Sequence, residues 1–103
     1  MKFSFSKYVW LDGKFVPLSK AKVPITTHAI HYGTSIFEGI RGYWSSKNLY
    51  IFRLNDHVKR LRNSGKFYNI TFNFSDRQIK NAVLNLCKKN KIKESCYIRP
   101  FYF

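Results

Sequence analysis

The regular alternation of side chains over residues 35–44 constrains the fold of this chain more than any other feature of its sequence. Side chains of a strand point to opposite faces at every second residue, so the segment is predicted to be a strand with two unlike faces. The first face carries Phe37, Gly39, Arg41 and Tyr43, and the second carries Ile36, Glu38 and Ile40. The first face would bury the Arg41 cation among aromatic rings, where it needs an anion or a polar acceptor. That partner is either a ligand or a structural group, such as one of the five acids or a backbone carbonyl.

Turn signals place further strands around this one. Asp12-Gly13 supplies the positive φ angles of a tight hairpin turn, and residues 45–48 turn the chain back after the alternating segment. The last strand also alternates, and one of its faces carries Tyr97, Arg99, Phe101 and Phe103. The expected strands cover residues 8–11, 14–17, 35–44, 49–53 and 95–103.

Two helices are expected between the last two of these strands. Asn55 is a good N-cap for a helix over residues 56–67, and Ser75 with Gln78 has the capping-box pattern that opens a second helix. The inward stripes of the two helices carry Val58, Leu61 and Gly65, and then Ile79, Val83, Leu86 and Cys87. Runs of strands and helices, without alternating βαβ units, predict an α+β fold in which two helices pack on an antiparallel sheet.

Length and composition bound this fold to one domain. The 103 residues suffice for a core, and 45% hydrophobic residues with 18% aromatics exclude a disordered tail. No linker or repeat divides the sequence, so residues 1–103 are expected to form a single domain. The sequence ends inside the apolar run Phe101-Tyr-Phe103 without a turn signal, which indicates a truncated domain.

The net charge of +14 raises nucleic acid as a partner, because dense positive charge releases counterions from phosphates. The basic residues are scattered, however, and the richest cluster, at 88–93, lies where the second helix should end and complements its dipole. A+T-rich coding DNA would by itself enrich Lys, Asn, Ile, Phe and Tyr. We therefore expect nucleic acid to bind only nonspecifically. The alternative function, a small basic nucleic-acid-binding domain, needs a face on which basic and aromatic side chains interleave.

The histidines and cysteines predict no metal site. Cys87 and Cys96 have neither a CxxC arrangement nor metal-ligand spacing, and free buried thiols suit a reducing cytoplasm. No carboxylate or cysteine completes a site with His28 and His31, so their imidazoles are expected to hydrogen-bond to the backbone and hold the loop of Tyr32. No apolar run approaches the roughly 20 residues of a membrane span, so a cytoplasmic protein is expected.

Several motifs resemble one family along the whole chain. They are Trp10-Leu-Asp-Gly13, Val16-Pro17, the run from His28 to Tyr43, Phe52-Arg53-Leu with Arg60 after it, and Tyr97-Ile-Arg-Pro100. Together they resemble the N-terminal domain of the branched-chain amino acid aminotransferases, pyridoxal-phosphate enzymes of fold type IV. His28-Ala-Ile-His-Tyr-Gly and Tyr97-Ile-Arg-Pro favour this branch over the D-amino acid transaminases and the aminodeoxychorismate lyases.

The resemblance implies roles for seven residues. Arg60 matches the arginine that binds the cofactor phosphate, whereas its neighbours Arg53 and Arg62 are expected to be surface residues. Tyr97 and Arg99 match the pair that receives the distal carboxylate of glutamate. The other substrate-binding positions are Tyr32, Phe37, Gly39 and Arg41. In that family the equivalent of the tyrosine reaches the active site of a neighbouring subunit, and the glycine would let backbone approach the ligand.

The implied enzyme transfers the amino group of leucine, isoleucine or valine to 2-oxoglutarate in branched-chain amino acid biosynthesis. Its cofactor is pyridoxal 5′-phosphate, and it forms a homo-oligomer. Its Schiff-base lysine lies beyond residue 103, and no lysine of this sequence matches that context. The 103 residues alone are therefore expected to be inactive, as one part of the enzyme. A further alternative is that the chain is the inactive remnant of a decayed gene.

Overall fold

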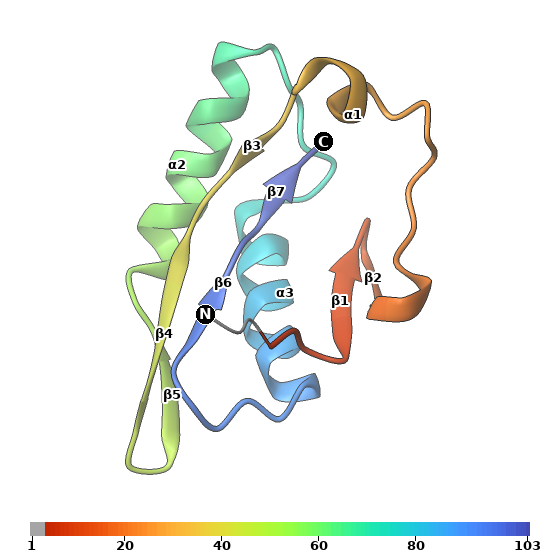
Figure 1. The fold of residues 1–103 in the computed structure, drawn as a ribbon. Helices are drawn as coiled ribbons and strands as arrows, with labels where there is room; N and C mark the ends of the chain where they lie inside the picture. The colour runs from red at the N-terminus through yellow and green to blue at the C-terminus, as the bar shows by residue number, and fades with distance from the viewer. Residues whose placement is uncertain (1–3) are drawn as a thin grey trace.

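The computed structural model describes residues 4–103 and places two long helices on one side of an antiparallel sheet, with a separate β-hairpin beside them (Figure 1). The strands are β1 (Tyr8–Leu11), β2 (Lys14–Pro17), β3 (Ile36–Phe37), β4 (Ile40–Ser45), β5 (Asn48–Ile51), β6 (Cys96–Ile98) and β7 (Phe101–Tyr102). The helices are α1 (His28–Tyr32), α2 (Leu54–Phe67) and α3 (Asp76–Lys89), with a 3-10 turn at Leu18–Lys20. The α+β fold expected from the sequence is confirmed.

The predicted hairpin of β1 and β2 is confirmed at both strands. Its turn residues Asp12 and Gly13 have φ angles of 48° and 90°, the left-handed region that this dipeptide reaches at low cost. The hairpin packs on α3 and pairs with no strand of the main sheet. The Asn90 side chain, just after α3, forms hydrogen bonds with the N–H and the carbonyl of Tyr8. These bonds tie the hairpin to the end of the helix.

The segment predicted as one strand over residues 35–44 forms two strands, β3 and β4, and the last strand is likewise divided into β6 and β7. The register is continuous across both divisions, with the pairs Ile36–Tyr102, Phe37–Phe101, Ile40–Ile98 and Arg41–Tyr97. Between them the N–H of Glu38 donates to the carbonyl of Pro100 at 3.0 Å, but Pro100 has no N–H with which to form the second bond of the pair. The proline therefore interrupts the ladder while the two strands continue side by side.

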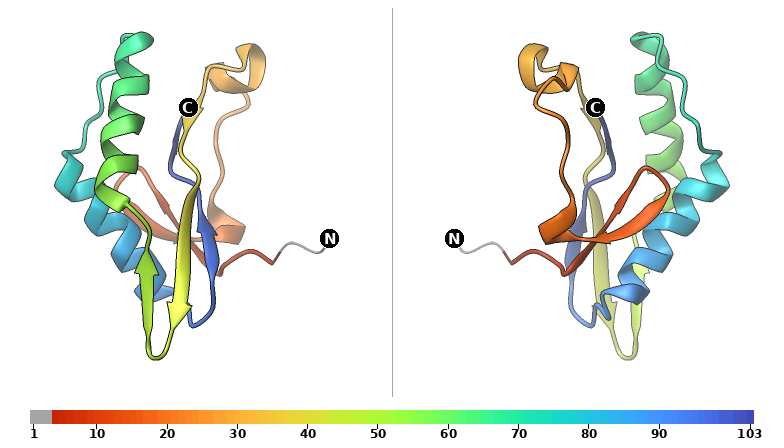
Figure 2. Two further views of the ribbon diagram at one scale, coloured as in Figure 1. Left: turned by 90° about the vertical axis from the view of Figure 1, so that its left-hand side faces the viewer. Right: turned by 90° about the vertical axis from the view of Figure 1, so that its right-hand side faces the viewer.

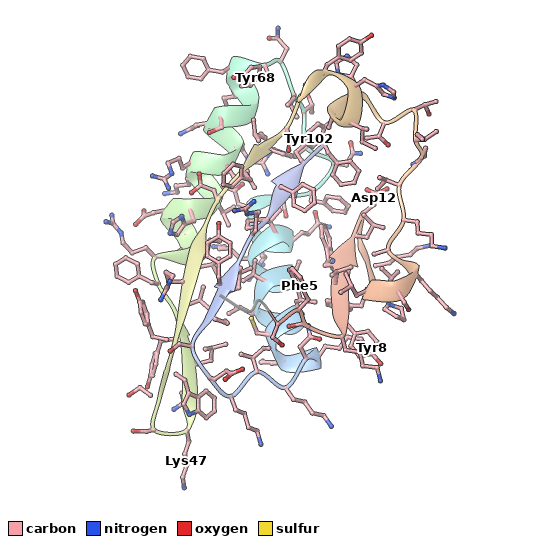
Figure 3. All side chains as sticks on the ribbon, viewed as in Figure 1. Phe5, Tyr8, Asp12, Lys47, Tyr68 and Tyr102 are labelled. Atoms are coloured by element: carbon pink, nitrogen blue, oxygen red, sulfur yellow. The ribbon has the colours of Figure 1, made fainter. Side chains whose placement is uncertain are left out.

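The third strand of the sheet, β5, pairs with β4 through the turn at residues 46–47, where Lys47 marks the far tip (Figure 3). It ends at Ile51, two residues before the predicted end. Phe52 keeps one backbone hydrogen bond to the Arg41 carbonyl at 2.9 Å, and the chain then enters α2.

The two long helices are confirmed, with a correction at the start of α2. Asn55 is not its N-cap, because the helix begins at Leu54, two residues before the predicted start. Arg53 precedes it in a left-handed conformation with φ 50°. The Arg53 side chain contacts Asp56 in the first turn, so an ion pair stands where a side-chain cap was expected. At α3 the predicted capping box is present, with reciprocal hydrogen bonds of 3.1 and 2.8 Å between Ser75 and Gln78.

The short helix α1 is absent from the sequence-based prediction, which placed a loop around Tyr32. It has five residues and ends at Gly33, whose φ of 67° lies in the left-handed region that terminates helices. So short a helix shows less than two turns of apolar periodicity, which is too little for a pattern to indicate it.

The sheet has two unlike faces, as the alternation of residues 35–44 predicts. The covered face lies under α2 and α3. The buried core between them consists of Ile36 and Ile40 from the sheet, Val58 and Leu61 from α2, and Ile79 and Val83 from α3. The open face carries Phe37, Gly39, Arg41, Tyr43, Tyr97, Arg99 and Phe101. Figure 2 shows both long helices on one side of the sheet, and α1 with the segment before it on the other. Leu86 and Cys87 of the predicted inward stripe are only half-buried, near the end of α3.

Candidate functional site

The open face gathers aromatic and cationic side chains from β3, β4, β6 and β7. Because Glu38 and Pro100 form a hydrogen-bonded pair, the pairs on either side of them are of the closely spaced kind, in which opposed side chains touch. The opposed pairs on the open face are Phe37–Phe101 and Arg41–Tyr97, and the continuous register places Gly39 opposite Arg99 between them. The aromatic members stay about half exposed, at 52% for Phe37, 56% for Phe101 and 51% for Tyr97.

Gly39 makes room for the phenol ring of Tyr97. A Cβ atom at residue 39 would lie 2.6 Å from the Tyr97 hydroxyl oxygen, closer than nonbonded atoms approach. The Arg99 Nε donates to the same hydroxyl at 3.2 Å, and the guanidinium carbon lies 4.5 Å from the centroid of the Phe37 ring, within the range of a cation–π contact. Tyr97, Arg99 and Phe37 therefore form one contact group over Gly39, and the tyrosine ring occupies the space that the glycine leaves.

Arg41 lies on the predicted face of its strand, but the expectation that this face buries it is wrong, because the side chain is exposed. Its guanidinium carbon is 5.9 Å from the centroid of the Tyr43 ring. The two long helices cover only the opposite face, so the Arg41 cation keeps its contact with water. It therefore needs no structural anion within the chain.

A shallow hollow opens on the open face beside Arg99. Its volume is about 180 Å³, and its lining consists of Ser35, Phe37, Arg99 and Phe101. A cation next to aromatic rings can hold a carboxylate beside an apolar group. A typical ligand pocket has a volume of at least roughly 300 Å³, so this hollow by itself is too small to enclose such a ligand.

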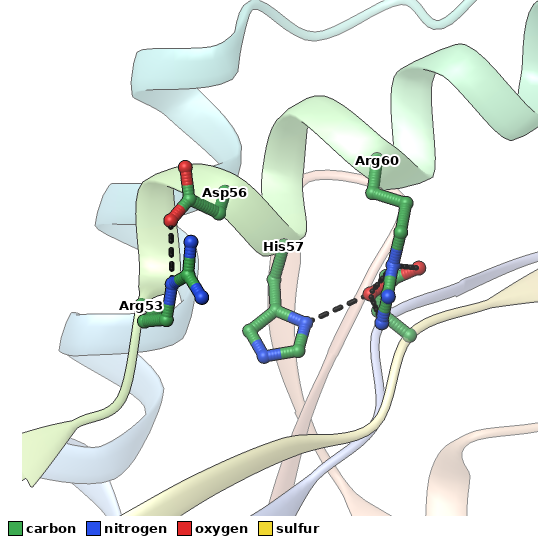
Figure 4. Close-up of polar contacts among 5 residues, drawn as sticks. Arg53, Asp56, His57 and Arg60 are labelled. Atoms are coloured by element: carbon green, nitrogen blue, oxygen red, sulfur yellow. Dashed lines mark hydrogen bonds and ion pairs between the residues drawn. The ribbon is translucent and has the colours of Figure 1, made fainter.

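Glu38 lies between β3 and β4, and its side chain points to the covered side, where only 5% of the residue is exposed. The Arg60 Nε donates to both of its carboxylate oxygens, at 2.9 and 3.0 Å, and His57 Nδ1 lies 2.8 Å from Oε1 (Figure 4). Burial raises the pKa of Glu38, but the hydrogen bonds with Arg60 and His57 outweigh burial and hold this pKa below its ordinary value. The same ion pair raises the pKa of Arg60. The Glu38 carboxylate therefore stays ionised while the Arg60 side chain remains 69% exposed.

The two other arginines of this segment have partners within the chain. Arg53 and Asp56 form an exposed ion pair at the start of α2, with Nε 2.8 Å from Oδ2. Arg62 reaches from α2 to Asp76 and donates to the Phe74 carbonyl at 2.7 Å, so it joins the two long helices. Both contacts are structural. Arg53 is 65% exposed, as expected of a surface residue, whereas Arg62 is only 29% exposed because it packs between the helices, so for Arg62 the expectation is wrong.

Tyr32 lies at the end of α1 with 75% of its surface exposed. His31 Nε2 is 2.7 Å from the Ile25 carbonyl oxygen, so its predicted bond to the backbone is confirmed. His28 Nδ1 is 2.8 Å from the Thr34 hydroxyl, so for this residue the expected backbone partner is wrong. Both contacts hold α1 to the segments that flank it. Within residues 4–103 no three His, Cys, Asp or Glu side chains gather in a way that could hold a metal ion.

The structure brings five of the seven predicted site residues together on the open face, namely Phe37, Gly39, Arg41, Tyr97 and Arg99. Arg60 stands on the covered side of the same sheet, and Tyr32 stands apart on α1. The sequence-based prediction left out Glu38 and His57 as functional residues. An acid on the inward face of an apolar strand was the available signal, because a buried carboxylate requires a cationic or hydrogen-bonding partner.

The family model described as Amino-transferase class IV matches residues 35–103. This match covers more than half of the chain and includes the whole open face together with α2 and α3. The chain therefore belongs to the class IV aminotransferase family.

Individual relatives agree with this. The chain is 43% identical over 96 residues to the branched-chain-amino-acid aminotransferase of Salmonella typhimurium, a match that covers 93% of this chain and 31% of the relative. The solved structure of the branched-chain amino acid aminotransferase from Escherichia coli has a TM-score of 0.91 at 40% identity, over 96% of this chain and 33% of that one. The branched-chain amino acid aminotransferase from Thermobaculum terrenum, solved in its PLP-form, has a TM-score of 0.82 at 35% identity, over 93% of this chain and 32% of that one.

The similarity to branched-chain amino acid aminotransferases that the motifs predict is thus confirmed. The chain spans about a third of the length of the curated relatives it matches. No helix of residues 4–103 combines the length and the apolar character needed to cross a membrane.

Proposed function

We propose that this chain is part of a branched-chain amino acid aminotransferase, which transfers the amino group of leucine, isoleucine or valine to 2-oxoglutarate. The observation that carries the proposal is the contact group of Tyr97, Arg99 and Phe37 over Gly39. Such an enzyme has to accept the charged side chain of glutamate and the alkyl side chain of leucine in one pocket. The identity of 43% to a branched-chain-amino-acid aminotransferase supports the same reaction.

The contact group is suited to both kinds of side chain. Arg99 can form a charge-assisted hydrogen bond with a distal carboxylate, and the Tyr97 hydroxyl can donate a second one. For an alkyl side chain, the Arg99 guanidinium can stay stacked on the Phe37 ring and leave an apolar wall. Tyr97 lies in β6 and Arg99 just after it, on the same face of the sheet, so the carboxylate-binding and alkyl-binding arrangements differ only in side-chain rotation.

The remaining substrate residues complete this wall. We assign Arg41 to substrate recognition as the second cation of the open face, next to Tyr43. Phe37 lines the pocket from β3. Tyr32, exposed at the end of α1, is assigned to the active site of a neighbouring subunit in a homo-oligomer, because an aromatic residue that exposed gains most when a partner covers it.

We assign Arg60 to the phosphate of pyridoxal 5′-phosphate. Glu38 holds one edge of its guanidinium, while the exposed remainder can form parallel hydrogen bonds with phosphate oxygens, so the residues present fit the group. When bound, the cofactor supplies an electron sink for the substrate Cα. Because Glu38 lies between Phe37 and Gly39 in sequence, the carboxylate that holds Arg60 and the proposed substrate wall lie on opposite faces of the sheet.

The remaining elements of the proposal concern the whole enzyme. Residues 1–103 form its small N-terminal domain, and the lysine that bonds to the cofactor lies in the larger part outside these residues. The enzyme works in the cytoplasm in branched-chain amino acid biosynthesis. The division into a small N-terminal domain and a larger part is supported by the match to about a third of each relative.

The test compares the complete gene product with the 103-residue chain. The complete protein should convert leucine and 2-oxoglutarate into the leucine keto acid and glutamate, and isoleucine and valine should replace leucine. The chain alone should show no turnover and should lose pyridoxal phosphate on dialysis. A complete protein that is inactive on all three amino acids would refute the reaction. Turnover by the chain alone, with one lysine modified stoichiometrically, would refute the placement of the catalytic lysine.

The alternative of a nucleic-acid-binding domain gains no support, because the contacts of Arg41 and Arg99 with aromatic rings on the open face do not by themselves indicate a nucleic-acid site. In the proposed function the same two residues recognise the substrate, and the family match supports that function. We therefore assign the charge of +14 only a nonspecific attraction to nucleic acid, which should fall steeply as salt rises to the physiological range.

A further inference from the structure

We propose that Glu38 is a positioning residue, which holds the Arg60 guanidinium so that its outer edge meets a phosphate group. The inference rests on the proposed function, in which Arg60 binds the cofactor phosphate. It gives a role to a buried carboxylate that has no contact with the substrate wall, and it explains why an apolar face of the sheet carries a charge.

The backbone of Glu38 is fixed independently of its side chain. Its N–H donates to the Pro100 carbonyl at 3.0 Å, in the register that continues from β3–β7 into β4–β6. The side chain then points toward α2 with 5% exposure. A carboxylate held this way has one position relative to the helix that carries Arg60.

The contact geometry leaves part of the Arg60 guanidinium for another anion. A guanidinium has five N–H groups in one plane, and Glu38 engages Nε together with one terminal nitrogen, at 2.8 Å from Oε1. The other N–H groups of the terminal nitrogens point away from this carboxylate, and the side chain is 69% exposed. An arginine that is already held in place loses less conformational freedom when the phosphate binds.

His57 holds the carboxylate in turn. It precedes Arg60 by three residues on α2, so the two side chains lie on the same side of the helix, and its Nδ1 is 2.8 Å from Oε1 (Figure 4). His57 and Arg60 are the two charged or titratable side chains that contact this carboxylate within residues 4–103. With both in place, the rotation of the Glu38 carboxylate is fixed from two directions.

Glu38 could also have the opposite effect on phosphate affinity, by competing with the phosphate for Arg60, and this contrast makes the proposal testable. The negative charge of Glu38 also lowers the positive potential at Arg60, so a carboxylate that merely competed with the phosphate would weaken binding. Removing the charge of Glu38 should lower phosphate affinity if Glu38 positions Arg60, and raise it if Glu38 competes.

The experiment uses the complete protein and measures the dissociation constants of pyridoxal 5′-phosphate and of pyridoxal, which lacks the phosphate. Glu38→Gln keeps the shape of the side chain and removes its charge. Asp56→Asn is the matched control. It removes the charge of an exposed carboxylate on α2, which pairs with Arg53 and not with Arg60. We expect Glu38→Gln to weaken binding of the phosphorylated form by roughly 2- to 10-fold and to leave pyridoxal unchanged, since ordering one long side chain accounts for about that factor. Asp56→Asn should change neither constant.

Arg60→Ala identifies the residue through which Glu38 acts. It should weaken binding of the phosphorylated form alone, and adding Glu38→Gln to it should have no further effect, because the group to be positioned is gone. If Glu38→Gln prevents folding, Glu38→Asp keeps the charge on a shorter side chain and should show the same phosphate-specific loss.

Three outcomes would overturn the inference. They are unchanged or tighter binding of the phosphorylated form in Glu38→Gln, equal losses for both ligands, and losses that add in the double variant. If Arg60→Ala leaves phosphate affinity unchanged, the phosphate assignment fails together with this inference. The proposed reaction is judged separately, by turnover of leucine with 2-oxoglutarate in the unsubstituted protein.

Discussion

The two faces of the sheet come from the same strands and yet differ in burial and in the partners of their charged side chains. On the covered face Ile36 and Ile40 are 7% and 0% exposed, whereas Phe37, between them in sequence, is 52% exposed. Alternation alone separates the two sets of side chains, and the position of α2 and α3 decides which set is buried. Large apolar side chains that stay exposed next to cations mark a surface that gains stability only when something covers it.

The charges on the two faces differ in the same way. On the covered face Glu38 has its hydrogen-bonding capacity satisfied by Arg60 and His57. On the open face Arg41 and Arg99 contact aromatic rings, which leaves their guanidinium groups able to bind an anion from outside. A charge satisfied within the chain maintains geometry, and a charge that rests on an aromatic ring can recognise a ligand.

The largest effect, on the free energy of unfolding, should follow from removing a buried side chain from the covered face. Ile40→Ala removes a side chain with no exposure, and we expect it to lower the free energy of unfolding by about 2–5 kcal/mol because of lost burial and the cavity that remains. Phe37→Ala, at the half-exposed position on the other face, should cost far less. Denaturant unfolding of both variants measures the difference, and equal losses would contradict the distinction between the faces.

The next effect concerns recognition on the open face. Arg99→Ala should raise the apparent KM for glutamate by about 10- to 100-fold, because a charge-assisted hydrogen bond to a carboxylate contributes about 1.5–3 kcal/mol. The apparent KM for leucine should change little. Arg53→Ala is the control, since Arg53 pairs with Asp56 away from this face. Losses of the same size for glutamate and leucine would remove Arg99 from the recognition of the carboxylate.

A smaller effect is expected at Gly39, where the backbone lies under the contact group of Tyr97, Arg99 and Phe37. Gly39→Ala places a Cβ atom 2.6 Å from the Tyr97 hydroxyl oxygen, so the ring has to swing away. Because that ring is half exposed, the free energy of unfolding should fall by only about 1 kcal/mol, at the low end for overpacking. The apparent KM for glutamate should nevertheless rise relative to that for leucine, as in Arg99→Ala. Unaltered glutamate recognition would show that the position of Tyr97 over Gly39 does not matter.

The effect that is smallest at neutral pH, where it vanishes, concerns the half-buried thiols on the covered side. Burial, with the neighbouring Cys96, raises the pKa of Cys87 to about 11. The thiol of an unfolded chain has a pKa of about 8.5, so the unfolded state loses this proton at a lower pH than the folded state. The free energy of unfolding should therefore decline as pH rises from about 8.5 toward 11. Cys87→Ala should reduce this decline. Alkylation of Cys87 at pH 8 should be slow and should accelerate up to about pH 11, and rapid alkylation at pH 8 would contradict the shift.

Local signals in the sequence determined the elements of this protein that depend on few neighbouring residues. Asp12-Gly13 reaches positive φ angles by itself, and Ser75 with Gln78 closes a capping box within three residues. The alternation of residues 35–44 defined two faces, because side-chain direction in a strand follows from the backbone alone. The run from His28 to Tyr43 and the motif Tyr97-Ile-Arg-Pro carried the resemblance from which the site residues of the open face were named.

Only the tertiary structure decided which face is covered and what the charges contact. Arg41 is exposed because α2 and α3 pack on the other side of its strand, and no pattern within the strand specifies that side. Glu38 meets His57 and Arg60 across 19 and 22 residues of sequence, so their contact depends on how α2 lies against the sheet. Contacts of this kind form only when two elements pack, since each element alone would leave its polar groups in water.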